Sequence, residues 1–207
     1  MRGESACPRC GAPVRAPGVF SSAWRCSVHG EVYPMQPPVL PTSEHLRQVA
    51  AQSAVPIWVP WPLPAGWLVT GLAWAGDDRG RLRAVAVACT GPNPLGGTGD
   101  MVLVAEEPGV GLGARYAGIP GPDPGGQLAS SPSDAKIETS GHPTPLWSVH
   151  GPDGRSSYAG EAGGVWLWLV LWPETTDLLM LAPLTLVDAR DPGFSFDLPV
   201  GALSPRL

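Results

Sequence analysis

Four residues whose side chains bind transition metals occur in two pairs near the start of the sequence. The members of each pair are separated by two residues, a glycine follows each pair, and fifteen residues lie between the pairs. A two-residue gap lets one tight turn direct two ligands at one ion, and glycine adopts the positive φ that such a turn often needs. Structural zinc sites use four cysteine and histidine ligands in a tetrahedron. The spacing therefore predicts one zinc ion bound by Cys7, Cys10, Cys26 and His29.

The four-ligand set predicts a structural rather than a catalytic zinc. A catalytic zinc usually has three protein ligands and keeps one position open for water. The sequence also contains no His-Glu-x-x-His run. Two alternatives stay open: a three-cysteine site completed by a group other than His29, and two unrelated cysteine pairs with a chance histidine.

The segment around these ligands, roughly residues 5–35, resembles a zinc ribbon, which is a pair of hairpins held by one zinc ion. Few apolar side chains accompany the ligands, namely Val14, Phe20, Trp24, Val32 and Tyr33. A module this small cannot bury a sufficient core, so we expect the metal to supply much of its stability.

Other segments offer weaker candidates for chemistry. Cys89 lies in an alternating apolar run, which favours a small buried side chain over a nucleophile. Residues 109–118 are rich in glycine, but the third glycine comes one residue too early for a dinucleotide fingerprint. The one lysine of the chain, Lys136, lies elsewhere, so a P-loop is excluded. We expect a structured surface loop at 109–118.

His142 and His150 flank Trp147 and, with nearby carboxylates, could serve as acid–base groups. No Gly-x-Ser-x-Gly motif accompanies them, so we favour loop histidines. The nine tryptophans suggest an aromatic groove for a ligand or a proline-rich partner. We favour a different role, which is to fill the core of a domain with few Phe and Tyr.

The composition is that of a globular, acidic protein. The chain has 207 residues, 43% of them hydrophobic, and a net charge of −5. Residues 1–35 hold four arginines against two glutamates, a net of +2, which is too small a patch for phosphate binding without help. No apolar leader is present, and the longest apolar run, 165–172, is too short to span a membrane. We expect a cytoplasmic protein with no membrane contact, whose cysteines bind metal or stay free.

The pattern of apolar runs predicts an α+β, mainly β, architecture in three parts. Residues 1–35 form the zinc-ribbon-like module, 36–65 a proline-rich linker with a short helix at 42–52, and 66–207 an antiparallel β-rich domain. The prolines at 56–64 exclude a central strand there. In the last part we expect strands at these positions: 67–75, 82–90, 101–106, 135–139, 145–149, 157–162, 165–172 and 184–188. Residues 77–80 and 163–164 are the expected hairpin turns, and 107–133 are irregular.

The chain resembles an uncharacterised family of actinobacterial proteins along its whole length. The resemblance rests on the ribbon, the linker and three further stretches, at 59–67, 111–118 and 201–207. That resemblance implies no activity and no functional residue.

Three hypotheses for function follow. The first is a non-enzymatic binding or adaptor protein with a structural zinc, whose partner is a protein or a small ligand. The second is an enzyme with its site near the loop 107–125 and His142 or His150. The third is a ribbon that contacts nucleic acid, linked to transcription, through Arg9, Arg15 and Arg25. The closed ligand set favours the first.

Overall fold

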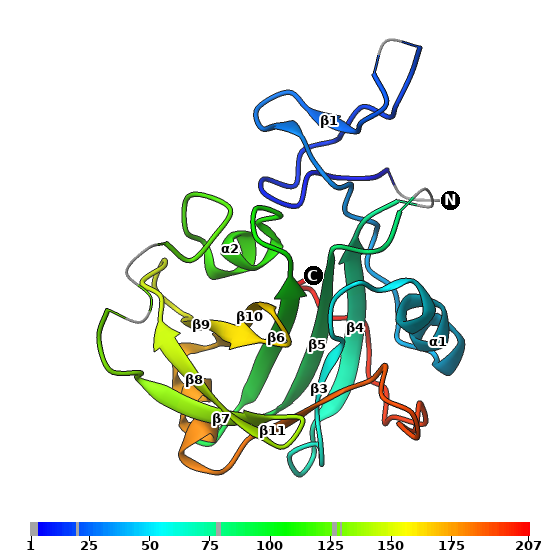
Figure 1. The fold of residues 1–207 in the computed structure, drawn as a ribbon. Coiled ribbons are helices and arrows are strands. Elements are labelled where there is room, and N and C mark those ends of the chain that lie inside the picture. Colours follow the sequence, from blue (N-terminus) through cyan, green and yellow to red (C-terminus); the bar gives the residue numbers. More distant parts are fainter. Residues whose placement is uncertain (1–3, 20, 78–79, 126–127, 129) are drawn as a thin grey trace.

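The structure of the protein is a computed structural model that describes residues 4–19, 21–77, 80–125, 128 and 130–207. Within them, a small N-terminal module precedes one large curled sheet with a few short helices (Figure 1). The predicted fold class is therefore confirmed. Phe20, and residues 78–79 of the expected hairpin turn, lie outside the described residues.

The large sheet has nine strands in the spatial order β3-β11-β7-β8-β9-β10-β6-β5-β4. Its strands are β3 (Trp58–Pro60), β4 (Leu68–Ala75), β5 (Ala84–Pro92), β6 (Thr98–Glu106), β7 (Ala135–Thr139), β8 (His142–Ser148), β9 (Ser156–Ala162), β10 (Val165–Trp172) and β11 (Thr185–Asp188). The module contributes β1 (Arg25–Cys26) and β2 (Gly30–Glu31), which form a separate two-stranded sheet. The helices are α1 (Ser43–Gln52), α2 (Leu112–Ala117) and the 3-10 helix η1 (Glu174–Leu181).

Strands β4, β5 and β6 form the expected antiparallel meander. Strand β10 pairs with β9 on one edge and β6 on the other, so it is central in the sheet. Both of its faces are covered, as its apolar residues on both faces predicted, because Leu169 packs in one core and Trp168 in the other. The turn between β9 and β10 is the expected Gly163–Gly164 hairpin. Alternation along the strands then separates two cores, because successive side chains point to opposite faces of the sheet.

One core lies inside the curl of the sheet and the other on its outer face. In β5, Val85, Val87 and Cys89 belong to the inner core. Their neighbours Ala84, Ala86 and Ala88 belong to the outer core. The outer core also contains Trp168, together with Leu112, Ala114 and Tyr116 of α2. Helix α2 therefore covers part of the outer face.

The remaining strands close the curl through pairings between distant segments. Strand β11 pairs in parallel with β7 and antiparallel with β3. Strand β3 is one of the two edge strands, the position at which a sheet tolerates a proline such as Pro60. Pro183 separates η1 from β11, as the interrupted apolar run before residue 188 predicted.

Helix α1 begins where expected, with Thr42 as its N-cap: the hydroxyl accepts the His45 backbone N–H at 3.2 Å. Helix α2 corrects a prediction. We expected a surface loop at 109–118, but six of its residues are helical and five of these are buried, among them Gly113 and Ala117. The helix is short enough to end before the prolines that follow it.

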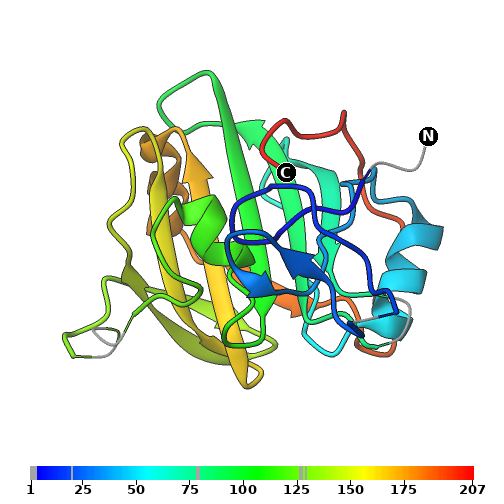
Figure 2. The ribbon, with the colours of Figure 1, turned by 90° about the horizontal axis from the view of Figure 1, so that it is seen from above.

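The N-terminal module is fixed to the sheet by backbone hydrogen bonds along the edge strand β4. Residues 34–39, at the start of the expected linker, run beside β4: Gln36 N donates to Trp74 O and Val39 N to Leu72 O, both at 2.9 Å. Ala6 and Met35 exchange a second pair of bonds. Figures 1 and 2 both place the module beside α2 and the end of β4. In the described part of the chain, none of the helices is long and apolar enough to cross a membrane.

Candidate metal centre

Two short hairpins bring the predicted ligands together. In the first, Cys7 N donates to Ala12 O and Gly11 N to Cys7 O, each at 2.8 Å, so that the chain turns back after Cys10. The second is the pairing of β1 and β2, in which Cys26 faces Gly30. Gly11 has φ of 73° and Gly30 has φ of 71°, the left-handed conformation expected of the glycine after each pair.

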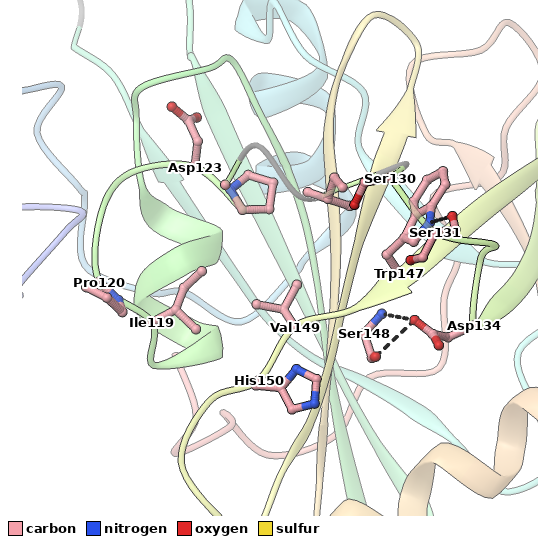
Figure 3. Close-up of a pocket in the computed structure, with 13 residues that line it drawn as sticks. Ile119, Pro120, Asp123, Ser130, Ser131, Asp134, Trp147, Ser148, Val149 and His150 are labelled. Carbon is pink, nitrogen blue, oxygen red and sulfur yellow. Dashed lines mark hydrogen bonds between the residues drawn. The ribbon is translucent and has the colours of Figure 1, made fainter.

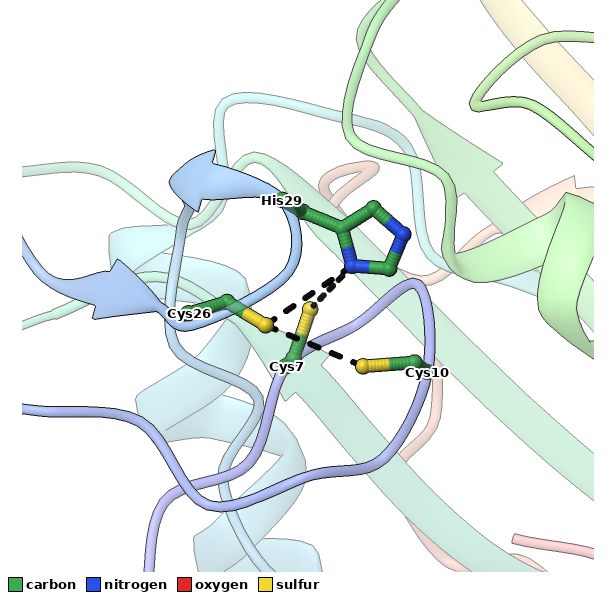
Figure 4. A group of neighbouring side chains, drawn as sticks. All are labelled: Cys7, Cys10, Cys26 and His29. Atoms are coloured by element: carbon green, nitrogen blue, oxygen red, sulfur yellow. Dashed lines mark hydrogen bonds between the residues drawn. The ribbon is translucent and has the colours of Figure 1, made fainter.

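The four ligand atoms lie within 4.8 Å of one another (Figure 4). His29 Nδ1 is 3.6 Å from Cys7 Sγ and 3.7 Å from Cys26 Sγ. Cys10 Sγ is 3.8 Å from Cys26 Sγ, and all three cysteines are free thiols. This Cys₃His group can hold one metal ion.

The spacing of these atoms can be compared with that of a tetrahedral site. With metal–sulfur bonds of about 2.3 Å and metal–nitrogen bonds of about 2.0 Å, a tetrahedron places two sulfurs about 3.8 Å apart and a sulfur and a nitrogen about 3.5 Å apart. The three contacts given above lie within about 0.2 Å of these values. These three spacings are those of a four-coordinate ion.

The surroundings of two ligands change their acidity in opposite directions. Backbone N–H groups of His29 and Val28 stabilise the thiolate of Cys26 and lower its pKa to about 6; the Val28 nitrogen is 3.4 Å from the sulfur. Burial raises the pKa of Cys7 to about 11. Because a metal binds the thiolate, Cys26 offers a donor that is already ionised at neutral pH.

The two candidate histidines lie in different places. His150 lines a pocket of about 650 Å³ between β8 and the loop after α2, whereas His142 lines a separate pocket of about 410 Å³ beside β3 and β11. Both side chains are exposed. The structure therefore does not bring His142 and His150 into one site.

In the larger pocket, Ser148 is hydrogen-bonded to a carboxylate. Asp134 accepts the Ser148 backbone N–H at 2.7 Å and its hydroxyl at 2.9 Å (Figure 3). These bonds, and to a smaller extent His150, lower the pKa of Asp134. A hydroxyl has one hydrogen to donate, so Ser148 does not donate it to His150. The arrangement is that of a fixed loop rather than of a serine activated by a histidine base.

The other candidates take structural positions. Cys89 is fully buried, and burial raises the pKa of its thiol to about 12, so it is the inert side chain that we expected. Trp58, Trp67, Trp168 and Trp172 are likewise buried, which agrees with a core-filling role. Trp61 remains 42% exposed and contacts Phe194 edge-on at 6.0 Å between ring centres.

Two residues at this end of the molecule were not identified from the sequence as parts of a site. Arg9, considered for nucleic acid alone, donates hydrogen bonds to the backbone carbonyls of Gly109 and Val110. Glu106 is fully buried and accepts the backbone N–H groups of Leu112 and Gly113. The one signal for Glu106 was a charged residue at the end of an apolar run, directly before the glycine-rich segment.

Comparisons with known proteins identify a family but no activity. A family model described as a family of unknown function (DUF6758) matches residues 1–207. No curated protein and no solved structure matches the chain.

Proposed function

The chain belongs to this family of unknown function, and we propose that it is a non-enzymatic binding or adaptor protein built around one structural zinc ion. The observation that carries the proposal is the group of four possible protein ligands, Cys7, Cys10, Cys26 and His29, whose donor atoms lie within 4.8 Å of one another. Four protein ligands leave no position for a water or a substrate. The ion would therefore hold the two hairpins together and take no part in a reaction.

Zinc is the metal that this donor set favours. Soft thiolates together with an imidazole in a tetrahedron are typical of zinc, whereas magnesium and calcium prefer oxygen ligands at higher coordination numbers. Three reduced thiols at one site also favour a reducing compartment, so we propose a cytoplasmic location. The hairpins bury few apolar side chains, and the ion would supply the stability that a larger core gives elsewhere.

The zinc-ribbon-like module is also the part that we propose to contact a partner protein. Val28 lies between the ligands Cys26 and His29 and is 74% exposed, and Val19 is 95% exposed. Tyr33, at the end of the module, is 45% exposed. Exposed apolar side chains on a small, rigid module are an effective docking surface.

Metal analysis of purified protein tests the zinc. We expect one equivalent of zinc per chain in the wild type and loss of it in Cys10→Ser, whose side chain is exposed and contributes little packing. Cys89→Ala is the matched control, because it removes a cysteine outside the site, and it should keep the full equivalent. Zinc retained by Cys10→Ser would contradict the four-ligand site.

Affinity capture from the native cytosol tests the adaptor role. The wild type and Val28→Ser, which keeps the ligands but removes an exposed apolar side chain, should differ in the partner that they retain. Turnover of a substrate by the zinc-loaded protein, abolished by a substitution of a polar residue in the sheet domain such as Asp134→Ala, would contradict the non-enzymatic role.

A further inference from the structure

We propose that the metal centre is a latch for the glycine-rich loop 109–111 and for α2, with Arg9 as the residue that connects them. The inference rests on the proposed zinc binding and adds a consequence to it: loss of the metal loosens this segment locally on the outer face of the sheet. The segment lies about a hundred residues away from the ligands in sequence but beside them in space (Figures 1 and 2).

Arg9 lies between two ligands, in the turn Cys7-Pro8-Arg9-Cys10. Its guanidinium donates from Nη2 to Gly109 O and, at 3.3 Å, from Nε to Val110 O. Its side chain also runs along Gly111: a Cβ added there would lie 2.8 Å from Arg9 Cγ. The turn that the metal closes fixes the direction of the Arg9 side chain. The hydrogen bonds from Arg9 to the loop therefore depend on the positions of Cys7 and Cys10.

A second arginine makes the reverse contact, from α2 to the module. The guanidinium of Arg115 lies beside Gly11, the residue after the ligand Cys10: a Cβ added to Gly11 would be 3.1 Å from its Nη2. Its Nη1 also lies 3.0 Å from the Met35 sulfur. Arg9 therefore connects the first hairpin to the loop before α2, and Arg115 connects α2 to Gly11 and Met35.

The far side of the loop is tied to the sheet. Asp123 accepts the Gly109 N–H at 2.8 Å and the Trp166 indole N–H at 3.0 Å. Glu106 holds the first two N–H groups of α2. Because these ties do not involve the module, metal loss should loosen the loop and α2 locally without unfolding the strands beneath.

The size of the effect follows from the bonds that are lost. Hydrogen bonds from a charged donor contribute about 1.5–3 kcal/mol, so losing the grip of Arg9 should raise local opening by about ten- to a hundredfold. A pocket of about 280 Å³ between the module and the loop, lined by Tyr33 and Val110 among others, would lose one of its walls.

Hydrogen exchange of the full-length protein, with and without a chelator, tests the latch. We expect the amides of residues 109–119 to exchange about ten- to a hundredfold faster after metal removal, while amides in β10 stay unchanged. Zinc-loaded Arg9→Ala should keep one equivalent of zinc and show most of this increase, and chelation should add the smaller part that the contacts of Arg115 contribute. Arg25→Ala is the matched control: Arg25 also adjoins a ligand, Cys26, but its charge lies 3.9 Å from exposed Glu31.

The outcomes distinguish a failure of the latch from a failure of the proposed zinc binding. Unchanged exchange at 109–119 in the metal-free protein, or in zinc-loaded Arg9→Ala, overturns the latch and leaves the structural zinc in place. Faster exchange in β10 as well would show global unfolding and also overturns it. A wild type without bound metal overturns the proposed function instead, and metal analysis of the same samples distinguishes that case.

Discussion

The carboxylate of Glu106 lies 2.7 Å from the backbone nitrogen of Leu112, the first residue of α2. Its other oxygen accepts the Gly113 N–H at 3.1 Å, so one buried side chain satisfies two N–H groups that have no partner within the helix. Burial raises the pKa of Glu106 to about 8 in spite of these bonds. The cost of removing the charged carboxylate from water is therefore larger than the stabilisation that its two hydrogen bonds provide.

This pKa predicts how stability depends on pH. The folded state keeps the proton of Glu106 up to about pH 8, whereas the unfolded state releases it near 4.5. Glu106 therefore stabilises the fold most below pH 4.5, and that contribution is lost as the pH rises toward 8. The total loss should be on the order of a few kcal/mol.

Urea unfolding of the wild type and Glu106→Gln between pH 5.5 and 8.5 measures this dependence. The variant has no group that titrates at this position, so its stability lacks the pH-dependent contribution of Glu106. The free energy of unfolding of the wild type should therefore fall relative to that of the variant as the pH rises. Parallel curves would show that Glu106 does not titrate in this range.

A second prediction concerns Gly113, which lies against the buried indole of Trp168. A Cβ added at Gly113 would lie 2.2 Å from the ring, and Trp168 is fully buried and cannot move aside. Alanine improves helix propensity by about 1 kcal/mol, but overpacking of this kind costs about 1–3 kcal/mol or more. The cost of overpacking is larger than the gain in helix propensity, so Gly113→Ala should lower the free energy of unfolding by about 2 kcal/mol.

The control for Gly113→Ala is Gly18→Ala. Gly18 has open space around it and no left-handed φ, so its change should stay within about 0.5 kcal/mol. Equal stability of the two variants would mean that α2 does not pack on Trp168 as described.

Gly113 also shows why α2 was not predicted. The glycines of the segment 109–118 and the prolines that follow it are typical of a loop, so the local sequence predicts no helix. The helix forms because Glu106 caps it and because Gly113 leaves room for a tryptophan 55 residues further along the chain. Neither condition is visible in the segment itself. The strands, by contrast, follow from alternation within each run and from glycines at the turns, which are local signals.

In the candidate metal site, too, some features follow from the local sequence and others do not. Each ligand pair lies within one turn, so the spacing of Cys7 and Cys10, and of Cys26 and His29, was sufficient to predict the group. The contact between the module and the loop before α2 joins Arg9 and Gly109, which are 100 residues apart in sequence. Contacts of that range follow from the folded arrangement and not from any spacing.

A third prediction concerns the buried ion pair that fixes the β3–β11 edge. Asp188 is 7% exposed, accepts the Ile57 N–H at 3.0 Å and pairs with Arg190 at 2.7 Å. Asp188→Ala leaves the Ile57 N–H without its acceptor and the half-buried guanidinium of Arg190 with its bond to Ala54 O but no carboxylate. It should lower the free energy of unfolding by about 3 kcal/mol, measured by urea unfolding.

The control for Asp188→Ala is Glu31→Ala. That residue pairs with Arg25 at 3.9 Å, and both side chains are more than half exposed. Water screens such a pair, so its loss should cost less than about 0.5 kcal/mol. A similar cost at both positions would show that the pairing at Asp188 contributes no more than a surface contact.

A last prediction concerns nucleic acid, for which Arg9, Arg15 and Arg25 were the expected contacts. Arg9 is engaged with the carbonyls of the loop, and Arg25 lies opposite Glu31, so the module presents less positive charge than its count of arginines suggests. Phosphate binding needs several unpaired cations acting together. We therefore expect a dissociation constant weaker than about 100 µM for a 20-base-pair duplex and for single-stranded RNA at low salt.

Fluorescence anisotropy with labelled duplex and RNA, repeated at increasing salt, measures this affinity. Binding tighter than about 1 µM that weakens steeply with salt would support a nucleic-acid role for the module. It should then be lost in Arg15→Ala but kept in Arg47→Ala, because Arg47 lies on α1, outside the module, and is similarly exposed. Loss in both variants would instead indicate attraction by overall charge, which a chain with a net charge of −5 makes weak.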